Sequence, residues 1–339
     1  MTRSLICHSV GPGVTIQDMG RSGTLAQGLS RGGAADRLAL YEGAALLNQS
    51  ADCAVLEMAG LGGVFEATED MRIALTGAPM KADIDGMPVI WNAVHALPAH
   101  ARLTLGAVQS GSYGYLHVGG GLETPQMLAA RSAHVAAGLG GLVEQGGRLP
   151  VGVDPGTETG LTLPAAPRFS GGDIRVTASL QTDHFDPADL ERFEATEFRR
   201  DPRANRMGVK VVGDGDGFLA KGGLQVLSEV IVPGDLQVTG DSMPFVLVAE
   251  SQTTGGYPRI ATVIPPDLPK VAQAPAGAFI RFRFVEIEDA VEIHRKFLAE
   301  ARALRKQVTP VLRDPSDLAN LAEFQLISGV TSGYEEGES

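Results

Sequence analysis

Residues 102–121 read RLTLGAVQSGSYGYLHVGGG and contain the pattern that indicates the fold. Two short apolar segments, 102–108 and 113–118, lie on either side of a turn rich in glycine and serine. Segments of this length, bounded by glycine and polar turn residues, are typical of β-strands. We therefore predict a hairpin-like β region here.

The same pattern recurs along the whole chain. In the first half it is found at residues 14–18, 53–58 and 71–77, and in the second half at 173–179, 224–238 and 245–251. The chain also contains 43 glycines and 20 prolines, a density that suits short strands joined by tight turns better than a helical bundle. These features predict a mainly β protein with a few helices.

The length and composition predict more than one domain. With 339 residues, 44% apolar and 20% charged, the chain is globular and long enough for two domains. Residues 150–170 carry proline and glycine without sustained periodicity, so we predict the linker there. Residues 106–118 and 234–248 share a glycine, a glutamine three residues later and an apolar strand. Duplicated barrels and a chance likeness of two hairpins explain this echo equally well.

Five segments have helical patterns. We predict helices at 35–48 with Asn48 at its end, at 124–137 with Thr124 as its cap, and from Asp186 onward. Residues 286–307 form a long amphipathic pattern, and a shorter helix is expected after Ser316. We expect this helical tail to cover a partner protein.

Charge and cysteine content exclude several classes of protein. The formal net charge is −12 without a notable basic cluster, which would repel nucleic acid. No stretch is long and apolar enough for a signal peptide or a membrane span, so we expect no membrane partner and a cytoplasmic location. Cys7 and Cys53 are too few for a disulfide framework and are expected to be buried, reduced thiols.

Familiar catalytic and metal motifs are not found. The chain has no G-x-S-x-G elbow and no P-loop, and its seven histidines lack the spacing of zinc ligands, so no metal site is predicted. The glycine runs at 119–121 and 138–141 could surround an anion or could serve tight turns. His117 is expected to be a strand side chain rather than a base.

Polar residues gather beside glycine in two segments. Gln17, Asp18 and Arg21 surround an expected turn at Gly20, where they could clamp a carboxylate or brace a loop. In residues 251–268, two threonines precede two glycines and a tyrosine, a combination that suits a ligand loop or an ordinary turn. From the residues alone, both pairs of alternatives stay open.

These segments carry a resemblance to a known family. The N-terminal half contains TIQDMGRSG, RGGAADRLAL, LLNQSADCAVLEM, ALTGAP, YLHVGGGLETP and RSA; the C-terminal half contains NRMGVKVVG, SEVIVPGDLQV and QTTGGYPRIATVIPPDLPKVAQ. Together they resemble the family that includes the C-type subunit of 5-oxoprolinase, allophanate hydrolase subunit 2 and KipA, also called biotin-dependent carboxyltransferase-like. The match runs in one order from about residue 10 to residue 285.

The resemblance implies an architecture and an activity. The architecture is two cyclophilin-like β-barrel lobes, at residues 1–165 and 166–285, followed by a helical tail at 286–339. The activity is that of the C-type subunit of an ATP-dependent 5-oxoprolinase, an amide-bond hydrolase active only as a complex. With a B-type and an A-type subunit it would open the small cyclic amide 5-oxoproline to glutamate. ATP would be the cofactor, and any Mg²⁺ would sit at the interface between subunits.

Two alternatives come with the same resemblance. One is the carboxyltransferase component of a split biotin-dependent urea carboxylase and allophanate hydrolase system, in which biotin would be the cofactor. The other is a KipA-like regulatory binding protein. The absence of a biotin-carboxylase region and of a biotinyl-lysine segment in this sequence favours the oxoprolinase.

The resemblance also implies site residues, which we expect around one hollow between the lobes. Asp18, Arg21, Asp36 and Arg206 are predicted to be catalytic. Substrate-binding roles fall to Gln17, Arg131, Ser132, Gln237, Thr253, Thr254, Gly255, Gly256 and Tyr257. Ala35, Ala130 and Ala133 depart from the family pattern, which has methionine, glycine, serine or threonine there. A lost hydroxyl near Arg131 removes one potential hydrogen bond and could change the substrate.

Overall fold

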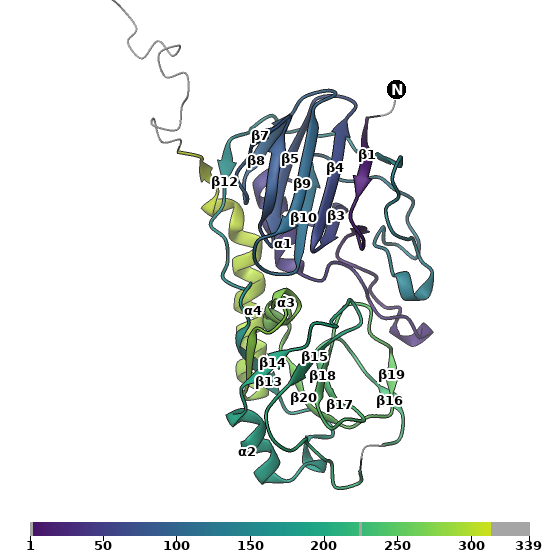
Figure 1. Ribbon diagram of the computed structural model, residues 1–339, viewed down its shortest axis with the longest axis vertical. Coiled ribbons are helices and arrows are strands. Elements are labelled where there is room, and N and C mark those ends of the chain that lie inside the picture. The colour runs from purple at the N-terminus through teal and green to yellow at the C-terminus, as the bar shows by residue number, and fades with distance from the viewer. Residues whose placement is uncertain (1–2, 224–225, 313–339) are drawn as a thin grey trace, which may run out of the picture.

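The computed structural model describes residues 3–223 and 226–312 of the chain. It has two β-rich lobes, one above the other in Figure 1, and a long helix that runs along one side of both. The mainly β prediction is confirmed, with four α-helices among the described residues. The helix expected after Ser316 lies outside the described residues.

The N-terminal lobe consists of two β-sheets that enclose a common core. Leu5 and Phe65 from one sheet and Leu56 and Leu75 from the other are all fully buried in the same apolar cluster. The six-stranded sheet has the order β11 (Arg148–Pro150), β1 (Ser4–Val10), β4 (Leu61–Ala67), β9 (Arg102–Val108), β6 (Met80–Ile84), β7 (Met87–Pro88). The five-stranded sheet has the order β2 (Thr15–Gln17), β3 (Val55–Ala59), β10 (Tyr113–Val118), β5 (Met71–Gly77), β8 (Val94–Leu97).

The two strands of the 102–121 stretch form as predicted, but they are not a hairpin. Strand β9 pairs with β4 and β6, whereas β10 pairs with β3 and β5 in the other sheet. Leu105 of β9 and Leu116 of β10 lie in the same buried cluster, so the strands belong to sheets packed face to face. The sequence similarity between residues 106–118 and 234–248 therefore does not reflect a shared hairpin. In 234–248 the two strands pair directly with each other, whereas in 106–118 they do not.

Helix α1 (Arg37–Leu47) packs on sheet strand β5. The Asp36 side chain caps its first turn by accepting a hydrogen bond from Ala39 N at 3.3 Å. Asn48 ends it in the left-handed conformation (φ 53°), as predicted. Its apolar residues Leu46 and Leu47 are fully buried against the sheet.

The C-terminal lobe is a closed barrel. Its strands follow the order β13 (Gly172–Thr177), β20 (Arg259–Val263), β17 (Asp235–Val238), β18 (Pro244–Leu247), β15 (Gly208–Val212), β14 (Phe198–Arg200), β21 (Phe279–Phe284). Helix α2 (Pro187–Ala195), which follows Asp186 as predicted, brings Phe193 into the core, where it stacks on Phe282 with ring centroids 5.1 Å apart. The single strand predicted at 224–238 is two: β17, and β16 (Glu229–Val230), which pairs with β19 (Thr254–Gly255).

The predicted helix at 124–137 is wrong. Residues 127–130 form a tight β-turn instead, with Leu128 and Ala129 at positive φ, and only Val135–Ala137 make a short 3₁₀ turn, η2. The cause is tertiary, since the backbone groups that a helix would pair internally bond to distant side chains. Met127 O accepts from Arg21, and Arg131 N donates to Asp18.

The long helix α4 (Ile287–Ala303) confirms the amphipathic pattern. It lies against α1 of the upper lobe and the η4 (Pro265–Asp267) turn that precedes α3 (Leu268–Gln273) (Figure 1). The chain then continues through η5 (Leu304–Gln307) to β22 (Thr309–Pro310), which pairs with β12 (Leu161–Thr162). The helix therefore covers both lobes of its own chain, and an additional partner for it stays a prediction. None of the described helices is long and apolar enough to cross a membrane.

Candidate functional site

The candidate site begins where two chain segments cross beneath the N-terminal lobe. Arg21 N donates to Arg31 O at 2.8 Å, and Ala34 N donates to Asp18 O at 2.9 Å. Gly33 has φ 81°, and a Cβ there would lie 2.7 Å from Gly20 N, so only glycine permits the crossing. The QDMGR and GGAAD motifs are thus one structural unit.

Arg21 lies inside this unit and is only 2% exposed. Its Nε donates to Met127 O at 3.0 Å, and its two Nη atoms donate to Ser132 Oγ at 3.2 Å and Ser132 O at 2.6 Å. Burial lowers the pKa of Arg21, while the carboxylates of Asp18 and Glu250 act in the opposite direction. The guanidinium therefore holds the 127–132 loop, and its predicted catalytic role stays a prediction.

Asp18 and Gln17 hold the same loop from the other side. Asp18 accepts from Gly20 N at 2.8 Å and from Arg131 N at 2.6 Å. Gln17 donates to Ala133 O at 3.3 Å, and its own Oε1 is buried without a hydrogen bond among the described residues. The Arg131 side chain turns back to Thr124 O. The structure therefore brings together five predicted residues: Gln17, Asp18, Arg21, Arg131 and Ser132.

Arg206, just before β15, connects the two lobes. Its Nε donates to Glu250 at 2.6 Å, its Nη2 donates to Gly33 O at 2.6 Å, and its Nη1 pairs with Glu57 of β3. Burial alone would lower the pKa of Arg206, but the adjacent Glu57 and Glu250 carboxylates raise it above its ordinary value. Sequence reasoning missed both glutamates; an acidic residue inside the apolar CAVLEM strand was the available signal.

His134 extends this ionic cluster into the N-terminal lobe. Its Nε2 lies 2.8 Å from Ser30 Oγ, and its Nδ1, which has no hydrogen bond among the described residues, is 3.9 Å from Glu250. Burial lowers the pKa of His134, and the Glu250 carboxylate opposes this. Glu250 also accepts from Val135 N at 3.1 Å. We call Arg21, Glu57, His134, Arg206 and Glu250 the junction cluster.

Asp36 lies deeper than the junction cluster and is fully buried. Besides capping α1, it accepts from Arg168 Nε at 2.6 Å and from Gln273 Nε2 at 2.9 Å. Arg168 also makes a two-pronged pair with Glu42 at 2.8 and 2.6 Å. Asp36 is thus committed to contacts within the protein, and its predicted catalytic role stays a prediction.

The threonine–glycine loop lies on the barrel and follows Glu250 of the junction cluster along the chain. Thr253 O accepts from Ile231 N at 3.0 Å, and Tyr257 is 42% exposed. Gln237 of β17 lies directly against Gly255, where a Cβ would clash with its amide nitrogen. That Nε2 is buried and has no hydrogen bond among the described residues. Gln237, Thr253, Thr254, Gly255, Gly256 and Tyr257 thus form a second group with a free amide donor.

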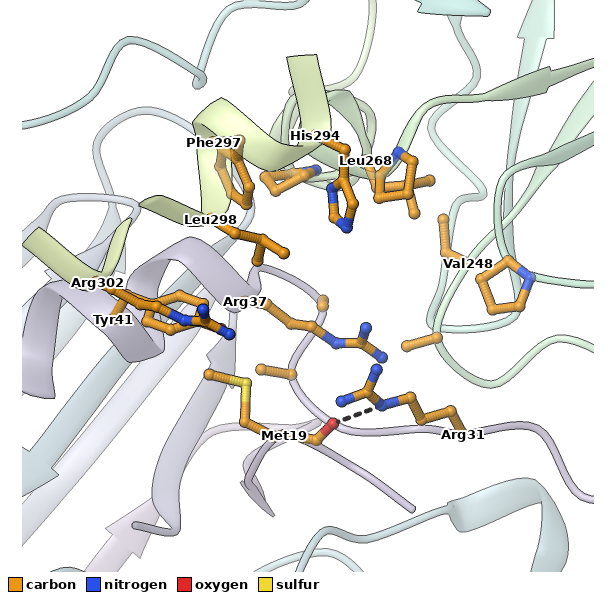
Figure 2. Close-up of a pocket in the computed structure, with 16 residues that line it drawn as sticks. Met19, Arg31, Arg37, Tyr41, Val248, Leu268, His294, Phe297, Leu298 and Arg302 are labelled. Atoms are coloured by element: carbon orange, nitrogen blue, oxygen red, sulfur yellow. Dashed lines mark hydrogen bonds between the residues drawn. The ribbon is translucent and has the colours of Figure 1, made fainter. Parts of the chain in front are cut away.

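A cavity of about 530 Å³ lies on the other side of the segment crossing, between the lobes and α4 (Figure 2). None of the predicted site residues lines it. Its walls are chain neighbours of the motifs and residues of α4: Met19, Arg31, Ala34, Ala35, Arg37, Tyr41, Pro233, Val248, Ala249, Pro265, Leu268, Pro269, His294, Phe297, Leu298 and Arg302. This cavity lies beside the motifs without including the predicted residues, and the single hollow expected around those residues stays a prediction.

The described residues contain no group of three or more histidine, cysteine or acidic side chains arranged to hold a metal ion. Both cysteines are free; Cys7 is buried as predicted, whereas Cys53 is half-buried. His117 lies in β10, where burial lowers its pKa to about 3. The side chains that the motifs bring together are arginines, carboxylates and amides, with the His134 imidazole and the Ser132 hydroxyl beside them.

Comparison with known proteins identifies the class of this chain. Residues 27–284 match the family model described as carboxyltransferase domain, subdomain A and B. The chain is 33% identical over 287 residues to the C-type subunit of 5-oxoprolinase from Haemophilus influenzae, covering 83% of this chain and 91% of that protein. The chain therefore belongs to the carboxyltransferase-domain family that includes this 5-oxoprolinase component, and the resemblance drawn from its motifs is confirmed.

Solved structures show the same fold. The crystal structure of TTHA0988 has a TM-score of 0.76 at 27% identity and is matched over 83% of this chain, which spans 56% of that protein. The urea amidolyase of K. lactis has a TM-score of 0.82 at 19% identity, with 93% of this chain and 21% of that chain covered. At this identity the second likeness concerns the fold alone.

Proposed function

We propose that this chain is the C-type subunit of an ATP-dependent 5-oxoprolinase. In this proposal it acts with a B-type and an A-type subunit to open the lactam of 5-oxoproline to glutamate. ATP, when bound, supplies the phosphoryl group that activates the lactam. Because the reaction consumes ATP and the two cysteines are free, we place the complex in the cytoplasm.

The observation that carries this proposal is the extent of the similarity to the H. influenzae protein. That similarity covers 91% of the H. influenzae chain and 83% of this one, so the two correspond over most of their length. The K. lactis urea amidolyase, in contrast, is matched over only 21% of its chain. Correspondence over most of both proteins supports a shared role better than one shared domain does.

The second residue group offers what a lactam requires. Gln237 presents an amide N–H that no described residue accepts, and it lies against the backbone of Gly255. Donors at the lactam oxygen would stabilise the charge that develops there when the amide is activated. The junction cluster would hold the barrel and its loop in a fixed relation to the N-terminal lobe.

Reconstitution tests the proposal. The chain is mixed with its B-type and A-type partners, ATP and 5-oxoproline, and ADP and glutamate are measured. We expect both products from the complete mixture and none when this chain is left out. In the complex, Gln237→Leu should lower glutamate formation by about 100-fold or more, because the amide donor is lost. Glutamate formation without this chain, or unchanged by its addition, would contradict the proposal.

The carboxyltransferase component of a split urea carboxylase is the second candidate. It is favoured by the match of residues 27–284 to a family model described as a carboxyltransferase domain. It predicts no ADP and no glutamate in the mixture above. Instead, carboxybiotin supplied on its carrier domain would lose its carboxyl group to urea only when this chain is present.

A further inference from the structure

The cavity between the lobes and α4 has an unusual charge. Arg31, Arg37 and Arg302 line it together with His294, and none of the residues lining it is acidic. Arg31 donates to Met19 O at 2.9 Å, and Arg37 donates to Gly32 O at 3.3 Å. Within residues 3–223 and 226–312, none of these three arginines has an ion-pair partner. In a chain of net charge −12, this leaves a cationic hollow with spare donors.

Two of the guanidinium groups are close together. In Figure 2 the heads of Arg31 and Arg37 lie next to each other at one end of the cavity. Burial lowers the pKa of Arg37 to about 10, and the neighbouring charge of Arg31 adds to this effect. An anion between the two heads would relieve their repulsion and accept bidentate hydrogen bonds.

A histidine on α4 also presents an unused polar atom. The Nδ1 atom of His294 is buried and has no hydrogen bond among the described residues. In Figure 2 its ring lies between α4 and the arginine end of the cavity. A buried ring nitrogen without a partner costs free energy unless a ligand or water satisfies it. His294 therefore adds a polar ring to the wall of the cavity beside the three arginines.

The rest of the cavity is apolar. Phe297 and Leu298 of α4 lie on one side of His294, and Leu268 of α3 and Val248 lie on the other (Figure 2). The volume of about 530 Å³ is far larger than a single inorganic ion and falls in the range of about 300–1,000 Å³ typical of small-molecule sites. The cavity is therefore suited to an anion that carries an organic body.

From this juxtaposition we propose that the cavity binds an organic phosphate of nucleotide size, with its phosphate between Arg31 and Arg37 and its body against Phe297 and Leu298. Arg302 and His294 lie at the sides, as further partners for the polar parts of the ligand. The walls come from α1, the barrel and α4, so the bound ligand would fasten both lobes to the helix. The proposal is argued from the cavity, although ATP is also the cofactor of the proposed function; binding to this chain alone tests the cavity, whereas glutamate formation by the complex tests the function.

Calorimetric titration of the full chain tests this proposal. The probes are ATP, inorganic phosphate and 5-oxoproline. We expect ATP to bind, and Arg37→Met to weaken it by about tenfold or more, as expected for losing a charge-assisted hydrogen bond. Ala35→Met, which fills the cavity without removing a charge, should weaken it as well. Arg203→Met is the matched control, since Arg203 is exposed, pairs with Asp201 and does not line the cavity.

The pattern across the variants decides the outcome. Binding that Arg37→Met and Ala35→Met both weaken, and Arg203→Met does not, supports the proposal. It is overturned if ATP does not bind at millimolar concentration, or if Arg37→Met binds it as well as the wild type. If inorganic phosphate binds as tightly as ATP, the role proposed for the organic body is overturned. If 5-oxoproline binds and ATP does not, the cavity is a carboxylate site and the proposal of an organic phosphate is overturned. Urea unfolding confirms that each variant is folded.

Discussion

The junction cluster and the cavity use the same kind of side chain in opposite ways. In the junction cluster, all three guanidinium nitrogens of Arg21 and of Arg206 donate to protein acceptors. In the cavity, the guanidinium groups of Arg31 and Arg37 each donate one hydrogen bond to a backbone carbonyl. Neither has a carboxylate partner among the described residues. Only a short stretch of chain separates Arg21 from Arg31, and the segment crossing divides the two environments.

This difference separates structural from ligand-binding arginines. A guanidinium whose donors are satisfied gains little from a ligand, and recruiting it would leave buried acceptors unpaired. An unpaired guanidinium at a cavity wall can meet an anion without breaking other contacts. The motif arginines are therefore expected to control stability, and the cavity arginines to control anion affinity.

The largest effect is expected from Arg206→Met. The substitution leaves the Glu57 and Glu250 carboxylates buried and without their shared cation, which costs about 3–5 kcal/mol of unfolding free energy. Urea denaturation at pH 7 measures the loss. Arg203→Met, which removes an exposed pair, should show no measurable loss. Equal stabilities of the two variants would contradict the distinction.

Arg21→Met should have the next largest effect. It leaves the acceptors of Met127 and Ser132 without a donor, for an expected loss of about 2–3 kcal/mol. The 127–132 loop would also be released, so trypsin should cleave after Arg131 faster than in the wild type. A loop that stays resistant in this variant would mean that Asp18 alone holds it.

ATP binding to the cavity should depend on pH in the alkaline range. Arg37, whose pKa is about 10, shares the cavity with Arg31, Tyr41, His294 and Arg302. Since the anion prefers the charged form, Kd should stay constant below about pH 9 and rise by about tenfold for each pH unit above 10. Titration of the wild type between about pH 8 and pH 11 measures this. The rise should disappear in Arg37→Met and persist in Tyr41→Phe; its survival in Arg37→Met would contradict the assignment.

Ser132→Ala should have the smallest effect. It removes one of the three acceptors of Arg21 and keeps the other two, so the expected loss is about 1 kcal/mol of unfolding free energy. The affinity of the cavity for ATP should not change. A change in that affinity would show that the junction cluster and the cavity are coupled.

The parts of the fold that depend on local pattern were predictable from the sequence. Strand β5, helix α1 with Asn48 at its end, and α4 all follow from the spacing of their apolar residues. The failures depend on distant contacts. The 124–137 segment has good helix formers, yet Arg21 and Asp18 occupy its backbone groups. Strands β9 and β10 look like a hairpin in the sequence because two strands show similar apolar patterns whether they pair in one sheet or belong to two sheets packed face to face.

The candidate site was predictable only where it coincides with motifs. Gln17, Asp18, Arg21, Arg131 and Ser132 do come together, although Arg21 and Asp18 contact the protein rather than an open hollow. The cavity arginines of α1 and α4 belong to helices separated by residues 48–286, so no local pattern joins them. Likewise, Glu250, which lies just before the threonine–glycine segment, forms its ion pair with Arg206 from another part of the barrel. No local pattern around Glu250 indicates this pair.

The most direct test is a crystal structure of the full chain with a non-hydrolysable ATP analogue. We predict phosphate oxygens within hydrogen-bond distance of Arg31 and Arg37, with Arg21 still bonded to Ser132 and Arg206 still bonded to its two glutamates. Phosphates bound instead by Arg21 or Arg206, with the cavity empty, would contradict the division between structural and ligand-binding arginines.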